Sequence, residues 1–219
     1  MVTISALPVT AQALKKAFES ADFIEIPASI DDFWQLIELP EYRIEYRIEY
    51  HNNQIVCTIS YASTPHETIV SNVSFEFRLM LNQGNHKTRI FGSNRRIYAV
   101  GCGNIYQADV HAIQGELKEH AYDKTKTATM NPIIIVEVHS KSTKNYDLTE
   151  KLDCYKTIPS VQQILYIDSE TLKVTVHNRT NKPNQWLTVD YRDASQAVKI
   201  LNKNLLLSKI YQDTGLVKS

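Results

Sequence analysis

The sequence predicts an α/β protein built on a central β-sheet, and two observations lead to this fold class. Residues 133–138 form the most apolar run of the chain, which is the pattern of a central strand covered on both faces. A helical segment over residues 144–156 and a buried strand over 163–167 follow, so the three segments form a strand–helix–strand unit with parallel strands. Strands predicted over 172–177 and 186–189 extend the sheet.

The N-terminal part of the chain predicts two short helices. Residues 10–20 carry apolar side chains four positions apart, which is the spacing of one helix face. Ser29 and Asp32 have the spacing of a capping box, so a second helix is expected to begin near Ile30. Pro40 ends this helix.

Residues 41–50 repeat the tetrapeptide Glu-Tyr-Arg-Ile, and two periods compete there. Read as a helix, the glutamates align on one face. Read as a strand, the isoleucines and tyrosines face one side and the charged residues face the other. Asn52 and Asn53 are typical of a tight hairpin turn, and residues 54–60 are a good return strand. The strand is therefore preferred over residues 44–50.

A longer helix is predicted over residues 64–82, because apolar side chains recur there along one helix face. Three apolar segments after it have the pattern of strands, at residues 89–91, 96–100 and 107–113. The C-terminal part, residues 194–211, predicts a helix or a mixed turn.

Length and charge set limits on the kind of protein. With 219 residues, 43% of them hydrophobic, the chain is long enough for one well-buried domain, and no linker or low-complexity segment divides it. Lys and Arg together number 24, as do Asp and Glu. This balance argues against a protein that coats nucleic acid through bulk charge, although it leaves room for a local basic groove.

The remaining composition predicts a cytoplasmic protein with no membrane contact. Cys57, Cys102 and Cys154 are an odd number of cysteines without metal-ligand spacing, so reduced thiols are expected. The N-terminus lacks the basic and apolar regions of a secretory signal. No apolar run approaches the roughly 20 residues that span a bilayer.

Two carboxylates stand out as candidates for metal-dependent chemistry. Glu137 lies inside the most apolar strand, and Asp109 lies on another predicted strand. A carboxylate in a buried strand is costly unless it is paired or binds a metal. Mg²⁺ prefers oxygen ligands, and it can activate water and neutralise charge on a scissile phosphate. The alternatives are a strand-end aspartate at 109 and a buried ion pair of Glu137, for example with Lys151.

Asp147, Lys151 and Tyr155 recur at intervals of four, so they lie on one face of their predicted helix. A lysine that points inward could orient the attacking water or stabilise developing negative charge. An ordinary ion pair between residues four apart, with the tyrosine packed beside it, is the simpler interpretation. The two interpretations are compatible. His66 lies at a helix start and His139 lies on the apolar strand. Neither histidine is expected to bind a metal without further ligands.

The chain resembles a known family at these residues. The run 131–143, followed by Asp147, Lys151 and Tyr155, is similar to the signature of the restriction-endonuclease-like family of Uma-type endonucleases, within the PD-(D/E)xK nuclease superfamily. The resemblance extends from about residue 30 to about 213. Shorter matches are Glu49 with Asn52-Asn53, Ser63 to His66, and Tyr106 to Val110.

The resemblance implies a restriction-endonuclease-like core, a central mixed β-sheet flanked by helices with an N-terminal helix–hairpin extension (an α/β, or α+β mixed-sheet, fold). A single domain over residues 1–219 is expected. Its parts would be an N-terminal helical extension over 1–40, the core over 41–190 and a C-terminal tail over 191–219.

The same resemblance implies roles for the site residues. Asp109 and Glu137 would bind the metal, with Glu49 as an additional acidic ligand. The superfamily's usual lysine would stand at His139, so Lys151 is expected to replace it from the following helix. Asp147 would position that lysine, and His66, His139 and Tyr155 complete the set of supporting residues.

The function expected from these residues is an endonuclease that depends on Mg²⁺ or Mn²⁺ and hydrolyses phosphodiester bonds in DNA, with RNA left open as a substrate. A homodimer is a further expectation, because double-strand cleavage benefits from two sites. One alternative is a catalytically inactive module of the same fold that binds nucleic acid or another protein. A weaker alternative is a structural or regulatory dimer.

Overall fold

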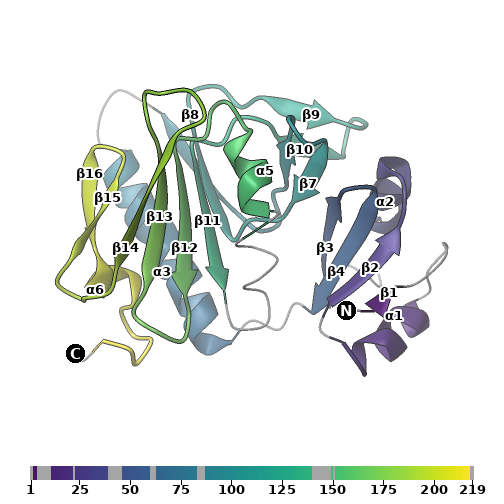
Figure 1. The fold of residues 1–219 in the computed structure, drawn as a ribbon, viewed down its shortest axis with the longest axis horizontal. Helices are drawn as coiled ribbons and strands as arrows, with labels where there is room; N and C mark the ends of the chain where they lie inside the picture. Colours follow the sequence, from purple (N-terminus) through teal and green to yellow (C-terminus); the bar gives the residue numbers. More distant parts are fainter. Residues whose placement is uncertain are drawn as a thin grey trace.

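A computed structural model contains two large β-sheets, with β11 to β14 on the left of Figure 1 and β2 to β4 on the right. The strand orders are β14-β13-β12-β11-β8-β5 in the six-stranded sheet and β1-β2-β4-β3-β7-β6-β10-β9 in the eight-stranded sheet. The structure describes residues 2–3, 11–21, 23–38, 46–59, 63–82, 87–139, 149 and 151–217.

The six-stranded sheet is mixed. Its parallel pair is β11 and β12, in register from Ile134↔Gln163 to His139↔Asp168, which confirms the parallel strands predicted around residues 133–167. The other neighbours are antiparallel. The strands are β5 (Thr88–Gly92), β8 (Val110–Gln114), β11 (Ile134–His139), β12 (Gln163–Asp168), β13 (Val174–Arg179) and β14 (Trp186–Tyr191).

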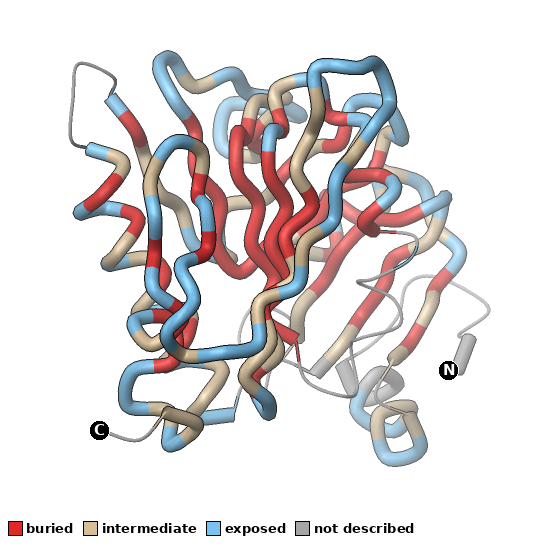
Figure 2. The backbone as a smooth tube through the Cα atoms, turned by 60° about the vertical axis from the view of Figure 1, so that its left-hand side comes forward, coloured by how far each residue is buried: buried red, intermediate tan, exposed pale blue. Residues whose placement is uncertain are grey.

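Strand β11 is buried on both faces, as its continuous apolar run predicts. Side chains of a strand alternate between faces, so Val136 packs in the core that contains helix α3 (Thr64–Leu81), while Ile135 packs with helix α5 (Leu152–Lys156) on the other face. Figure 2 shows the buried backbone concentrated in these central strands. Because Glu137 shares the parity of Ile135, its carboxylate is directed to the α5 face.

The eight-stranded sheet contains the predicted hairpin of β3 (Tyr46–His51) and β4 (Gln54–Ile59). Asn52 and Asn53 have φ of 49° and 61°, the left-handed conformation of a tight hairpin turn, which asparagine tolerates. The other strands are β1 (Val2–Thr3), β2 (Phe23–Pro27), β6 (Ile97–Ala99), β7 (Asn104–Tyr106), β9 (Glu119–Ala121) and β10 (Thr127–Thr129).

Both predicted N-terminal helices are present, as α1 (Ala11–Phe18) and α2 (Ile30–Leu36). The Ser29 hydroxyl accepts from the Asp32 backbone N–H, and the Asp32 carboxylate accepts from the Ser29 backbone N–H at 2.8 Å. This is the predicted capping box. No helix in the described ranges is long and apolar enough to cross a membrane.

The C-terminal part differs from its prediction. Residues 194–211 hold a hairpin of β15 (Ala197–Ile200) and β16 (Lys203–Leu206) before a short helix α6 (Leu207–Ile210). Burial alternates along β15 as expected for a strand: Val198 and Ile200 are buried, whereas Ala197 and Lys199 are exposed.

The strand predicted over residues 107–113 is also corrected. The chain forms β7 up to Tyr106, breaks over 107–109, and resumes as β8 at Val110. The break has a physical reason: the Gln107 backbone N–H donates to the Glu49 side chain at 2.7 Å instead of to a neighbouring strand. Asp109 therefore lies at the entrance to β8, outside a regular ladder.

The expectation of reduced thiols is wrong for two of the three cysteines. Cys102, in the turn between β6 and β7, is joined by a disulfide to Cys154 on α5, with Cα atoms 5.9 Å apart. The two cysteines are 52 positions apart in the sequence, so no short spacing between them indicated the disulfide. Cys57 is free and buried, and burial raises the pKa of its thiol to about 12.

His177 on β13 makes unfolding sensitive to mild acid. Burial lowers the pKa of His177 to about 4 from its ordinary 6.5, and its Nδ1 lies 2.8 Å from the Thr188 hydroxyl. Between these two values the unfolded chain takes up a proton that the folded protein does not, so stability falls as pH drops from 6.5 towards 4. We expect urea titrations to show this loss, at up to about 1.4 kcal/mol per pH unit. If His177→Gln has the same pH slope as the wild type, this source of acid sensitivity is ruled out.

Candidate active site at the junction of the two sheets

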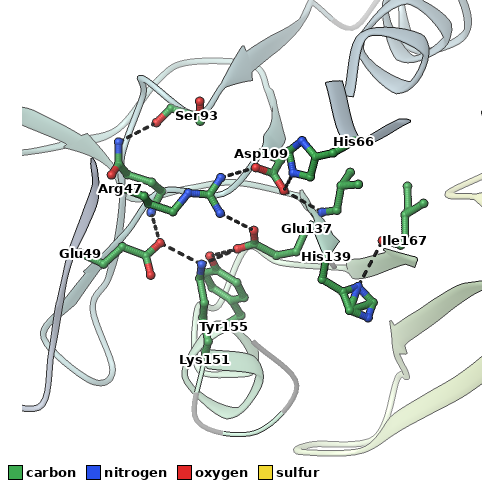
Figure 3. A network of polar contacts seen from close by, with 12 residues as sticks. Arg47, Glu49, His66, Ser93, Asp109, Glu137, His139, Lys151, Tyr155 and Ile167 are labelled. Atoms are coloured by element: carbon green, nitrogen blue, oxygen red, sulfur yellow. Dashed lines mark hydrogen bonds and ion pairs between the residues drawn. The ribbon is translucent and has the colours of Figure 1, made fainter. Parts of the chain in front are cut away.

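Asp109, at the entrance to β8, and Glu137, on the neighbouring strand β11, lie side by side (Figure 3). Strands β8 and β11 are antiparallel neighbours, with Val110 opposite Val136. One oxygen of Asp109, Oδ2, accepts from the Val138 backbone N–H at 2.7 Å, which anchors the aspartate beside Glu137. Both carboxylates are buried.

Lys151 joins the two sheets through its ammonium group. Its Nζ lies 2.8 Å from Glu137 Oε1 and 2.8 Å from Glu49 Oε1, and the side chain is completely buried at the start of α5. The ion pair between Glu137 and Lys151 that the sequence suggested is therefore present. Glu49 comes from β3 of the other sheet, so one lysine links both sheets through two buried carboxylates.

Tyr155 follows Lys151 by four residues and faces the same carboxylate, as the spacing predicts. Its hydroxyl donates to Glu137 Oε1 at 2.7 Å. Burial, together with the charges of Glu137 and Glu49, raises the pKa of Tyr155 well above its ordinary value. The phenol therefore stays protonated and remains a hydrogen-bond donor, so Lys151 and Tyr155 together fix one oxygen of Glu137.

Arg47 is a member of this site that the sequence did not single out. One guanidinium nitrogen, Nη2, pairs with Asp109 Oδ1, and the other, Nη1, lies 3.9 Å from Glu137 Oε2. Arg47 stands two residues before Glu49 on β3, so both side chains lie on one face of that strand. The alternation of charged residues on this face was the one signal that could have found it.

His66 reaches Asp109 from the first turn of α3. The Ser63 hydroxyl caps this helix by accepting from the His66 backbone N–H at 3.4 Å, and His66 Nε2 lies 3.5 Å from Asp109 Oδ2. Burial favours the neutral imidazole, but the contacts with Asp109 outweigh it and the pKa of His66 is raised.

Asp109 is held in its ionised form. Burial alone would raise the pKa of Asp109, yet Arg47, His66 and the Val138 backbone N–H together lower it well below its usual range. The carboxylate is therefore negatively charged at neutral pH, as a metal ligand must be.

His139, one of the predicted supporting residues, is directed to another part of the structure. The Nδ1 of His139 lies 3.1 Å from the Ile167 carbonyl oxygen, and its ring packs edge-on against Tyr166. In Figure 3 this ring points away from the Asp109–Glu137 pair. Asp147 lies outside the described residues. The structure thus brings together Glu49, His66, Asp109, Glu137, Lys151 and Tyr155, and adds Arg47.

The donor set suits a hard divalent cation. Asp109 and Glu137 offer carboxylate oxygens to one position, where the Arg47 guanidinium now supplies positive charge. The described part of the chain contains no group of three or more His, Cys, Asp or Glu side chains arranged to hold a metal. An ion here would take its other ligands from water and phosphate, as Mg²⁺ commonly does. Glu49 contacts Lys151, and its role as a metal ligand stays a prediction.

A mixed sheet that brings two carboxylates and a buried lysine together is the arrangement that the resemblance to restriction-endonuclease-like proteins implies. The comparisons with known proteins agree. Residues 31–207 match the model of the Uma2 family, described as "Putative restriction endonuclease". The chain belongs to this family, which confirms the resemblance found in the sequence.

The known proteins that are similar to the chain include a sequence relative and a solved structure. An uncharacterized protein of Synechocystis sp. is 31% identical over 136 residues, which cover 62% of this chain and 73% of that protein. A crystal structure of "a putative nuclease belonging to DUF820" from Anabaena variabilis superposes with a TM-score of 0.62. That match has 16% identity and covers 82% of this chain and 96% of the other, so it confirms the fold class.

Proposed function

We propose that this protein is a metal-dependent endonuclease that hydrolyses phosphodiester bonds in DNA, with Mg²⁺ or Mn²⁺ as its cofactor. The observation that carries the proposal is that two buried carboxylates, Asp109 before β8 and Glu137 on β11, both face the guanidinium of Arg47. Burying two carboxylates together is expensive, and a fold that needed only packing would place apolar side chains there. Membership of a family of restriction-endonuclease-like proteins supports the same chemistry.

Asp109 and Glu137 are the residues that would hold the ion. When bound, the ion supplies an activated water and neutralises charge on the scissile phosphate. The chain's own groups prepare its ligands. Lys151 and Tyr155 both contact Glu137 Oε1 and so set the orientation of that carboxylate. His66 and the Val138 backbone N–H do the same for Asp109.

An inactive module of the same fold is the second candidate, and one observation favours it. Lys151 is buried between two carboxylates at 2.8 Å from each, so its contacts in this structure serve an ion-pair network. Such a module would bind nucleic acid or a protein without turnover. The inactive module would be identified if the wild type cleaves no substrate and if Asp109→Asn and Glu137→Gln leave its binding of nucleic acid or protein unchanged.

The proposal is tested with plasmid DNA in Mg²⁺ or Mn²⁺ and with Glu137→Gln, which removes one charge at constant shape. We expect the wild type to nick or linearise the plasmid and Glu137→Gln to be slower by about a hundredfold or more, since a metal ligand is lost. The matched control is Glu119→Gln on β9, an exposed glutamate paired with Arg95, which should cleave at the wild-type rate. A wild type that leaves supercoiled, linear and single-stranded DNA intact in both metals would refute the DNA nuclease. Parallel incubations with RNA would then decide whether the substrate differs.

A further inference from the structure

The two cationic side chains of the site differ in how they are held. Lys151 is completely buried and fixed between Glu137 and Glu49. Arg47 lies at the rim, with 22% of its side chain exposed, and its guanidinium pairs with Asp109 Oδ1 and lies 3.9 Å from Glu137 Oε2. One positive charge is therefore part of the interior, while the other has a path to solvent.

The guanidinium of Arg47 stands where a divalent ion would be bound. Asp109 and Glu137 are the residues that would hold a metal ion, and the guanidinium faces their oxygens Oδ1 and Oε2. The other oxygens of the pair are engaged by backbone and side-chain donors, with Val138 on Asp109 and with Tyr155 and Lys151 on Glu137. Arg47 and the ion therefore compete for the same two atoms.

Arg47 also has a structural role beside the two carboxylates. Two adjacent buried carboxylates repel each other when both are ionised, and a nearby cation relieves that repulsion. A planar guanidinium can meet two carboxylates at once, and it is less strongly hydrated than an ammonium group. Arg47 thus supplies positive charge beside both carboxylates, and its partly exposed side chain has a path into water.

We propose that Arg47 is an internal counter-ion of the Asp109–Glu137 pair, so that a divalent cation binds by exchange with its guanidinium. This inference rests on the proposed function only in assigning a divalent ion to these two carboxylates. Arg47 is a positioning residue in this role, because it acts through the ligands. If the ion must displace the guanidinium, the protein binds the metal more weakly than it would without Arg47.

The test is a titration of the full chain with Mn²⁺ by isothermal calorimetry, without DNA. Arg47→Gln removes the competing charge, so we expect it to bind Mn²⁺ about tenfold more tightly than the wild type. Arg47→Lys keeps a cation but cannot bridge both carboxylates, so its affinity should fall between the two. Arg95→Gln is the matched control, because Arg95 is also partly exposed, at 24%, and paired with one carboxylate, Glu119. It should bind Mn²⁺ like the wild type.

A second readout covers the case in which Arg47→Gln folds poorly. Without metal the variant should melt at a lower temperature than the wild type, because its carboxylates repel each other, and saturating Mn²⁺ should raise its melting temperature by more. Arg47→Lys supplies the same comparison in a milder form. Equal or weaker Mn²⁺ binding by both Arg47 variants overturns the exchange, as does a wild type that binds no Mn²⁺.

The outcomes separate this inference from the nuclease assignment. Tighter Mn²⁺ binding by Arg47→Gln in a protein that cleaves no DNA upholds the exchange and defeats the proposed function. Metal-dependent cleavage by the wild type, with Mn²⁺ affinities that do not change on replacing Arg47, upholds the function and defeats the exchange.

Discussion

Replacing Lys151 by methionine is expected to lower the free energy of unfolding by about 3–5 kcal/mol, because it removes one partner from a buried charge network. The side chain is completely buried, and its Nζ lies 2.8 Å from both Glu49 and Glu137. Methionine has a similar length, so packing is largely kept while two buried carboxylates lose their shared counter-charge. Urea denaturation at pH 7, followed by circular dichroism, measures the loss.

The matched control lies in the same helix. Lys156 pairs with Asp153 at 3.2 Å near the protein surface. Lys156→Met makes the same chemical change at an exposed pair, where less than about 1 kcal/mol is expected. Two variants of equal stability would show that the buried network contributes no more than a surface ion pair. Any Lys151→Met protein that folds should also fail to cleave DNA, because Glu137 is no longer held in place.

The second large effect concerns the core behind the site. Phe77 on α3 is completely buried and packs in the core that contains β11. Phe77→Ala is expected to lower the free energy of unfolding by about 3–5 kcal/mol, through lost burial and the cavity left behind. The midpoint of urea unfolding reports it.

Phe75, two residues earlier on the same helix, is the control for this substitution. Its side chain is 59% exposed, so Phe75→Ala should change the unfolding free energy by less than about 0.5 kcal/mol. The pair tests whether α3 is oriented as described. Similar losses in the two variants, or a larger loss at Phe75, would mean that the helix turns a different face to the sheet.

The sequence was most informative where burial and charge conflict. Glu137 in an apolar strand is costly, and that cost alone pointed to a partner, which the structure shows to be Lys151 and Tyr155. The helical spacing of four placed those two residues on one face. The capping box at Ser29 and the Asn52–Asn53 turn were readable because their chemistry is local.

Features that depend on contacts between distant parts of the chain could not be predicted from the sequence. The charged residues of β3 alternate in the same way whether their face is exposed to solvent or packed against another part of the protein. The sequence therefore gave no reason to place Arg47 in the site rather than on the surface. Strands β9 and β10 have three residues each, too few for a period to be recognised. The disulfide joins a turn to a helix, and no local sequence pattern around Cys102 or Cys154 predicts that the two residues pair.

The linking of the two sheets by Lys151 has a consequence for when the candidate site is assembled. Lys151 meets Glu49 across 102 positions of sequence, and Arg47 meets Asp109 across 62. Contacts this distant pay a large loop-closure entropy and form late. A nascent or partly folded chain therefore holds the separate carboxylates but not their assembled geometry. The contacts of Lys151 with Glu49 and Glu137 can form only after the chain has been synthesised up to α5.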